Sequence, residues 1–294
     1  MTVEVDLLSD FIDIIRNELG LDPSMNGNEV VIKYAWYDLR RLPQKKWKVQ
    51  YSKELQQNPF FINHREYIDN IKNKAEVGED ITQHASILIN NIQGKDDMLA
   101  DWGIYHLHPG HGTRTARTHG FENRAAELLF VFPQKENLYF IDVLDHNSWT
   151  SFSLIEVIDK NWPSTLDQWR LKGVTGLAYE PTEDDLYKLR ENQLNVSFRI
   201  GDSFFIGAGG GIATDGSSGK AVRMAINISD VLDNYSDQLK KEETKLRKLV
   251  EEKIGNQLSF ENLLLSLSRF DPKTGKGDIL EKNTNILFSF SLVA

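Results

Sequence analysis

The chain has 294 residues, no cysteine and a formal net charge of −9 at neutral pH. This length can bury a sizeable core, as one large domain or two of ordinary size. The lack of cysteine excludes disulfides, thiolate metal ligands and cysteine nucleophiles, and the acidic charge argues against a surface coated throughout with nucleic acid. No apolar run reaches the roughly eighteen residues typical of a membrane span, so we expect no membrane span. A cytoplasmic setting is the default expectation for a chain without cysteine.

Residues 1–100 predict an N-terminal α+β region. The opening segment places Leu7, Phe11 and Ile15 on one side of a helix. The stretches EVVIKYAWYDL and KKWKVQY favour two strands, because the first is rich in β-branched and aromatic residues and the second alternates. Residues 58–91 predict helices.

A basic stretch runs from Leu39 to Lys53, with six basic residues and no acid. Basic residues interleaved with aromatic rings are typical of surfaces that hold a phosphate backbone and stack a base. Lys45, Lys46 and Trp47 are therefore candidates for substrate binding. The alternative is a solvated strand pair whose lysines protect an exposed edge.

Residues 101–175 predict an antiparallel meander of three strands, DWGIYHLH, ELLFVFP and LYFIDVLDH, the last two joined by the short link QKEN. The first and third strands of a meander run in the same direction, so their carboxyl ends lie at one edge of the sheet. His106 and His108 end the first strand, and His146 ends the third. We therefore expect these three histidines to converge.

The segment between the first two of these strands is long for a compact domain, and long connections are often functional. It carries several basic candidates for substrate binding, which suit an anionic substrate such as a phosphodiester: Arg114, Arg117, His119 and Arg124.

Two chemistries fit these residues. In the first, His108 and His146 exchange protons with RNA, His106 orients them or shares the work, and Arg117 and Arg124 bind the phosphate, with no cofactor. In the second, His106 and His108, with His146 or His119, hold a zinc ion that activates water. A third reading makes the histidines structural sheet residues.

Two resemblances bear on this choice. The string GIYHLHPG resembles the first half of the JAMM metalloprotease signature, which implies that His106 and His108 are zinc ligands. The resemblance ends there, because Ala116 stands where that motif has serine and His119 where it has aspartate. The hairpin ELLFVFPQKENLYFIDVLDH is similar to the central hairpin of RelE-like ribonuclease toxins, in which catalytic groups lie at strand ends.

Residues 176–294 predict a C-terminal α+β region. A helix starts after Thr182, VSFRIGDSFFIG forms a strand pair, and a long helix covers residues 219–254. The glycine-rich loop at 207–221 departs from a Walker A loop, since Thr214 replaces its first glycine and Ala221 its hydroxyl residue. The loop is expected to turn sharply and to cap the long helix, and its amides could hold a phosphate beside Lys220.

The sequence thus predicts an α+β protein with a mixed or antiparallel central sheet, flanking helices and a long C-terminal helix. The favoured function is a metal-independent endoribonuclease with RNA as its partner, of a kind that suits a toxin or antiviral defence effector restrained by an inhibitor protein. One alternative is a zinc-dependent hydrolase. The other is a non-catalytic nucleic-acid-binding or assembly module, a homo-oligomer through its long helix.

Overall fold

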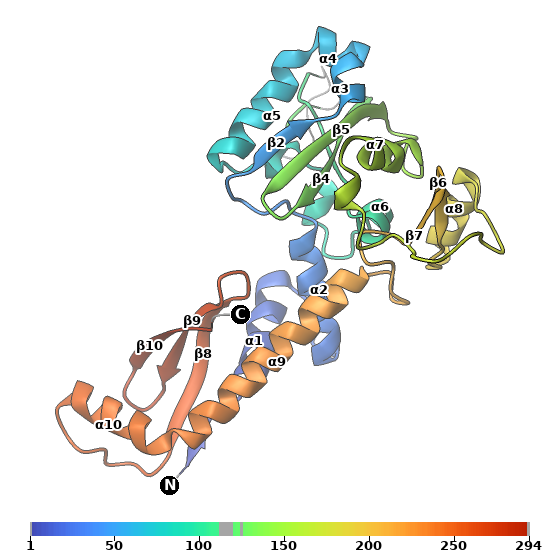
Figure 1. Cartoon of the computed structure of the whole chain (residues 1–294). Coiled ribbons are helices and arrows are strands. Elements are labelled where there is room, and N and C mark those ends of the chain that lie inside the picture. Colours follow the sequence, from blue (N-terminus) through green and yellow to red (C-terminus); the bar gives the residue numbers. More distant parts are fainter. Residues whose placement is uncertain (1, 112–119, 124–125, 293–294) are drawn as a thin grey trace. The chain divides into compact units, whose positions relative to one another are not determined.

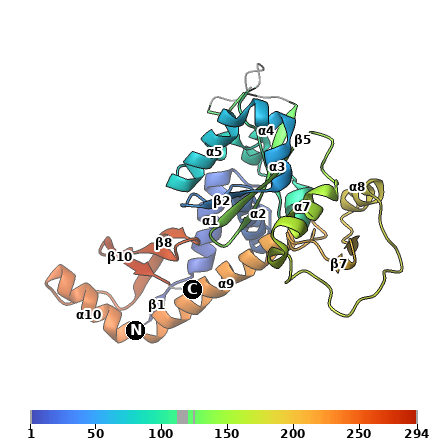
Figure 2. The ribbon, with the colours of Figure 1, turned by 45° about the horizontal axis from the view of Figure 1, so that its top comes forward.

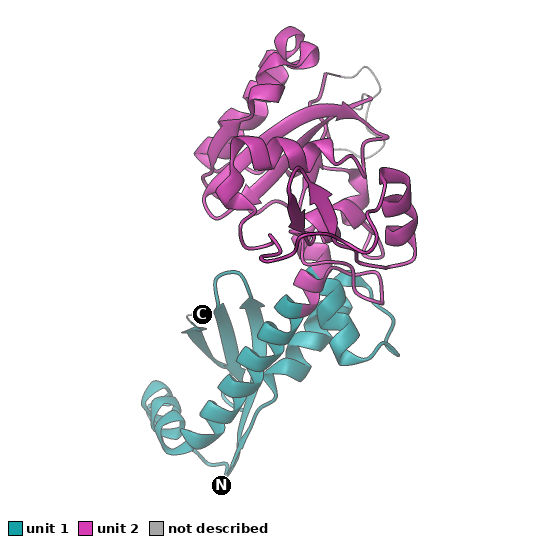
Figure 3. Cartoon of the chain, turned by 45° about the vertical axis from the view of Figure 1, so that its right-hand side comes forward, with its two compact units in different colours: residues 1–35, 223–294 teal, residues 36–222 magenta. Residues whose placement is uncertain are grey.

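The computed structural model describes residues 2–111, 120–123 and 126–292. The chain forms two compact units, residues 1–35 with 223–294 and residues 36–222 (Figure 3). The predicted α+β class is confirmed, with mixed and antiparallel sheets. The units differ from the three consecutive regions expected from the sequence, because the first unit combines both ends of the chain. Among the described residues, no helix has the length and apolar character needed to cross a membrane.

The first unit is a four-stranded sheet with helices packed against it (Figure 1). Its strand order is β1-β8-β9-β10, with β1 parallel to β8 and the other neighbours antiparallel. The elements are β1 (Val3–Glu4), α1 (Leu7–Leu19), α9 (Gly219–Lys241), α10 (Glu243–Ile254), β8 (Leu263–Asp271), β9 (Lys276–Glu281) and β10 (Ile286–Ser291), and α2 (Gly27–Leu39) leads into the second unit.

Aromatic rings fasten the helices to this sheet. The rings of Phe11 on α1 and Phe270 on β8 lie 5.6 Å apart, and those of Tyr235 on α9 and Phe290 on β10 lie 4.9 Å apart. Both sheet phenylalanines face Gly277 of β9, where a Cβ atom would lie 2.4 Å from the Phe290 ring. The glycine therefore leaves room for these edge-to-face and tilted ring contacts.

Two predicted elements differ from the structure. EVVIKYAWYDL is part of the helix α2 and not a strand, because the Asn26 side chain accepts a hydrogen bond from the Glu29 amide and starts a helix that buries Val30, Val31 and Ala35. Packing of this face overrides the weak preference of valine and isoleucine for strands. The predicted long helix is two helices, α9 and α10, separated at Glu242.

The second unit is built on the sheet that carries the histidines. Its strand order is β2-β5-β4-β3, with β2 parallel to β5 and the rest antiparallel, which confirms the meander. Figure 2 shows the helices and strands of the second unit from another side. They are β2 (Lys48–Tyr51), α3 (Lys53–Gln57), α4 (Pro59–Asn63), α5 (Arg65–Val77), η1 (Thr82–His84), η2 (Ile87–Asn90), α6 (Asp97–Trp102), β3 (Tyr105–Leu107), β4 (Glu127–Gln134), β5 (Asn137–Asp145), α7 (Ser153–Asn161), η3 (Pro163–Thr165), α8 (Glu183–Glu191), β6 (Phe198–Ile200) and β7 (Ser203–Phe205).

The central strand β4 is buried on both faces, which explains its unbroken apolar run LLFVF. Phe130 and Phe132 belong to a core that also contains Trp102 of α6, Ile155 of α7 and Phe198 of β6. This rigid sheet presents the carboxyl ends of β3 and β5 at one edge. The site described below is formed there.

DWGIYHLH is not one strand, as the sequence suggested. Asp96 caps α6, which continues to Trp102 and ends at Gly103 in a left-handed conformation, so that β3 is left with Tyr105–Leu107. His106 is therefore within the strand, and His108 lies just beyond it.

The glycine-rich loop packs directly on the end of α6. The Gly209 amide donates a hydrogen bond to the Asp101 carbonyl at 2.7 Å, and Ser218 caps α9 through the amides of Lys220 and Ala221. The loop thus makes its turn and its cap as predicted, and its glycines allow backbone to lie on backbone.

We expect Gly209→Ala to destabilise the second unit by about 1–3 kcal/mol, the usual cost of overpacking. The new Cβ atom would lie 2.4 Å from the carbonyl oxygens of Leu99 and Ala100, which are helix backbone and cannot move aside. Urea denaturation measures the effect. The matched control is Gly176→Ala, where nothing lies within 4 Å of the added atom. Equal stability of the two variants would contradict this account of the loop.

Candidate functional site

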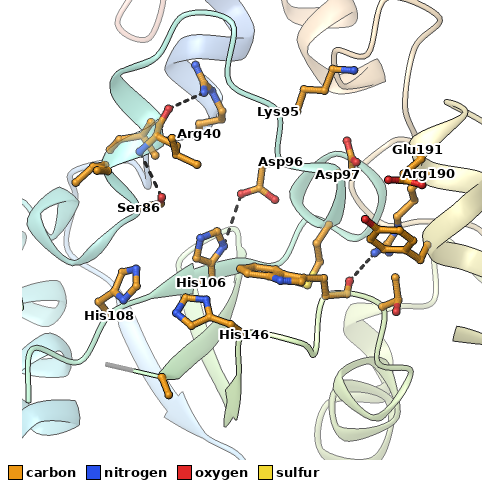
Figure 4. A pocket seen from close by; sticks show the side chains of 18 residues that line it. Arg40, Ser86, Lys95, Asp96, Asp97, His106, His108, His146, Arg190 and Glu191 are labelled. Carbon is orange, nitrogen blue, oxygen red and sulfur yellow. Dashed lines mark hydrogen bonds and ion pairs between the residues drawn. The ribbon is translucent and has the colours of Figure 1, made fainter. Parts of the chain in front are cut away.

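A cavity of about 990 Å³ opens at the edge of the sheet where β3 and β5 end (Figure 4). His106, His108 and His146 all line it, so the structure brings together the three histidines that the sequence analysis placed at one edge. Most of the remaining lining side chains come from residues 86–98, which include η2 and the start of α6, from the turn after β5, and from α8. Arg40 and Ala126 complete the wall. The volume lies at the upper end of the range of about 300–1,000 Å³ found for ligand pockets.

His108 and His146 face one another across this edge. Their ring centroids lie 5.8 Å apart, with the ring planes inclined at 45°. The two histidines come from parallel-running strands that are separated by β4, and each lies one residue beyond the end of its strand. The sheet therefore brings the two histidines to the same edge.

His106 lies beside a carboxylate. Its Nδ1 atom is 3.7 Å from Oδ2 of Asp96, while Oδ1 of Asp96 accepts a hydrogen bond from the Leu99 amide. One oxygen of this carboxylate thus caps α6 and the other faces the imidazole. Sequence reasoning missed Asp96, because the helix that it caps was taken for the start of a strand.

Trp149 packs among the histidines. The Trp149 and His106 rings are nearly perpendicular, with their centroids 4.7 Å apart, and the ring centroid of His146 is 6.0 Å from that of Trp149. The backbone oxygen of Trp149 accepts a hydrogen bond from Arg190 of α8 at 2.5 Å. The turn after β5 is thereby tied to α8, which the sequence could not indicate.

Both cations and carboxylates line the cavity, but its two arginines have structural partners. Arg40 donates to the carbonyl oxygens of Leu88 and Asn91, and Arg190 donates to the Asp101 carboxylate. Burial raises the pKa of Asp97, which lies next to Asp96 on the cavity wall. The remaining charged side chains of the wall are Lys95 and Glu191.

Four candidates for substrate binding come from the segment between β3 and β4. Arg114, Arg117, His119 and Arg124 fall outside the described residues. His111 pairs with Glu127 through Nε2 at 3.2 Å and packs on Phe60.

Within the basic stretch, Arg40 lines the cavity, whereas Lys45, Lys46 and Trp47 are not part of its wall. Trp47 is only 6% exposed, its Nε1 donates to the Pro43 carbonyl, and Lys45 Nζ lies 4.1 Å from its ring centroid. The expectation of an exposed Trp47 ring that stacks a base is therefore wrong, because the indole belongs to the core. Lys45 and Lys46 remain exposed.

Among residues 2–111, 120–123 and 126–292, no group of three or more histidine or acidic side chains is arranged to hold a metal ion. Ligand sets that include His119 lie outside this part of the chain.

Comparison with protein-family models, with curated proteins and with solved structures found no match to this chain.

Proposed function

We propose that the chain is an endoribonuclease that cleaves RNA by histidine acid-base catalysis, without a metal ion. The observation that carries the proposal is the pair His108 and His146, 5.8 Å apart between ring centroids on the wall of one large cavity. Two imidazoles on either side of a phosphodiester can act as base and acid in the same step. Histidine suits both roles because it titrates near neutral pH.

In the proposed reaction, one imidazole takes the proton of the RNA 2′-hydroxyl as the 2′-oxygen attacks phosphorus. The bond from phosphorus to the 5′-oxygen breaks, and the second imidazole gives a proton to that oxygen. The products are a 2′,3′-cyclic phosphate and a 5′-hydroxyl end. In this scheme each imidazole holds one of the two reacting oxygens through a hydrogen bond of about 2.7–3.0 Å.

His106 is proposed to orient the catalytic pair or to share its proton transfer. Its Nδ1 atom lies 3.7 Å from Oδ2 of Asp96, and this contact holds the ring at the cavity wall. Arg117 and Arg124 are proposed to bind the phosphate, and this role rests on the sequence alone.

The test is cleavage of three matched oligonucleotides: RNA, the corresponding DNA, and DNA with a single ribonucleotide. We expect cleavage of the RNA, one cut in the chimera, none in the DNA, and unchanged rates in the presence of a chelator. Cleavage of the DNA would overturn the mechanism, because the 2′-oxygen is the nucleophile. Loss of activity on chelation would instead favour the zinc hydrolase. His146→Ala protein purified in the same way controls for contaminating ribonuclease.

A further inference from the structure

His84 and His108 are joined by two hydrogen bonds in opposite directions. The His108 amide donates to the His84 carbonyl at 2.6 Å, and Nδ1 of the His84 ring lies 2.9 Å from the His108 carbonyl oxygen. Both polar backbone groups of His108 are thus satisfied by one residue. His108 lies just beyond β3, where the pairing of β3 with β4 has ended at Leu107 and Leu129. Without this link, the sheet would not determine where the backbone of His108 lies.

The contact also determines the form of the His84 ring. A carbonyl oxygen can only accept, so Nδ1 carries the proton. The ring is fully buried, and burial lowers the pKa of His84, which keeps it neutral. The Nε2 atom of His84 then acts as an acceptor. It lies 3.5 Å from Lys74 Nζ and 3.5 Å from the side-chain nitrogen Nε2 of Gln83. The second charged neighbour is Glu122, whose Oε1 atom lies 3.9 Å from Nε2 of His84.

The same short helix, η1, also holds the chain farther along. The Glu122 amide donates to the Gln83 carbonyl at 2.9 Å. A Cβ atom on Gly110 would lie 2.9 Å from the Glu122 carboxylate. The two ends of the segment between Gly110 and Glu122 therefore lie close together. Gln83 and His84 therefore fasten the chain on both sides of that segment.

We propose that His84 is a positioning residue that holds the His108 imidazole opposite His146 through the Nδ1 hydrogen bond to the His108 carbonyl. The role rests on the proposed function, since it serves the proton transfer assigned to His108. His84 does not line the cavity and is not a catalytic residue. Reasoning from the sequence passed over it because it lies 24 residues before His108.

The first test concerns the wild-type protein and does not depend on activity. Long-range proton–nitrogen NMR spectra should show His84 as the neutral tautomer with the proton on Nδ1, still neutral below pH 6.5, where a free histidine becomes charged. A proton on Nε2, or ordinary titration of His84, would overturn the proposal whether or not the chain cleaves RNA.

The second test uses two variants of similar size, His84→Leu and His84→Asn. Leucine removes the donor, while the asparagine amide can donate from about the position of Nδ1. We expect His84→Leu to lower kcat roughly 10–100-fold with little change in KM, as for a misplaced catalytic group, and to shift the titration of His108. His84→Asn should restore most of the wild-type kcat and most of the wild-type titration behaviour of His108. His64→Leu, which removes a histidine outside the cavity wall, should change neither.

Equal losses in the leucine and asparagine variants would overturn the proposal, because the donor would then not matter. Wild-type rates and an unchanged His108 titration in His84→Leu would overturn it as well. If the leucine variant does not fold, the tautomer of the wild-type ring decides. Should no RNA be cleaved at all, the shift in the His108 titration still tests the positioning, and the failure belongs to the proposed function.

Discussion

Replacement of His108 or His146 by alanine should each lower the rate of RNA cleavage by on the order of 10²–10⁴, the usual contribution of a general acid or base. The centroids of the two rings lie 5.8 Å apart on the cavity wall, where each imidazole is proposed to carry out one of the two proton transfers. Single-turnover kinetics on a short RNA measure the loss. The double variant should lose little more than either single variant, because the two residues act in one step.

The pH profile gives an independent reading of the same pair. The rate should rise and then fall with pH, because one histidine must be neutral and the other protonated. Each single variant should lose one limb of this bell. His64→Ala serves as the matched control and should keep both limbs and the full rate. Full activity in His108→Ala and in His146→Ala would reject the histidine site.

The second large effect concerns stability. Arg190→Leu should destabilise the second unit by about 3–5 kcal/mol, the usual cost of leaving one partner of a buried ion pair without the other. Arg190 donates through Nε and Nη2 to Oδ2 of Asp101, at 3.0 and 2.9 Å, and the two side chains are only 4% and 7% exposed. The variant would keep a buried carboxylate without its cation. Denaturation by urea measures the change.

This loss should depend on pH in a definite direction. Burial raises the pKa of Asp101, and Arg190 opposes that rise, so removal of Arg190 raises the pKa further. The folded variant would then bind a proton at a pH where the unfolded chain, with a carboxyl pKa of about 3.9, has released it. The loss in free energy of unfolding of Arg190→Leu, relative to the wild type, should therefore be largest near neutral pH. It should shrink as the pH falls to the raised pKa of Asp101 and below it.

Two further variants test the cause. Asp101→Asn combined with Arg190→Leu removes both charges and should recover much of the lost stability. Lys48→Ala breaks an ion pair with Glu136 whose side chains are 73% and 72% exposed, and it should change stability by no more than about 1 kcal/mol. A double variant as unstable as Arg190→Leu would show that the buried charge is not the cause.

Much of the candidate site followed from local patterns in the sequence. The hairpin of β4 and β5 and the capping box at Thr182 depend on residues close together in the chain, so their patterns predicted them. Because a meander brings the ends of β3 and β5 to the same edge, the sequence alone placed His106, His108 and His146 together. The convergence of these three histidines needed no tertiary information beyond the order of three consecutive strands.

The tertiary structure decided what depends on distant segments. Val3 pairs with Leu263, which assembles the first unit from the two ends of the chain, and no local pattern carries the register of such a pair. Packing made α2 a helix and buried Trp47, against their local composition. The partners of the site residues were likewise hidden, since Asp101 lies 89 residues from Arg190 and His84 meets His108 only after folding. Side-chain and backbone hydrogen bonds of this kind require exact positions, which many sequences of the same hydrophobic pattern would not share, and only the packed chain specifies them.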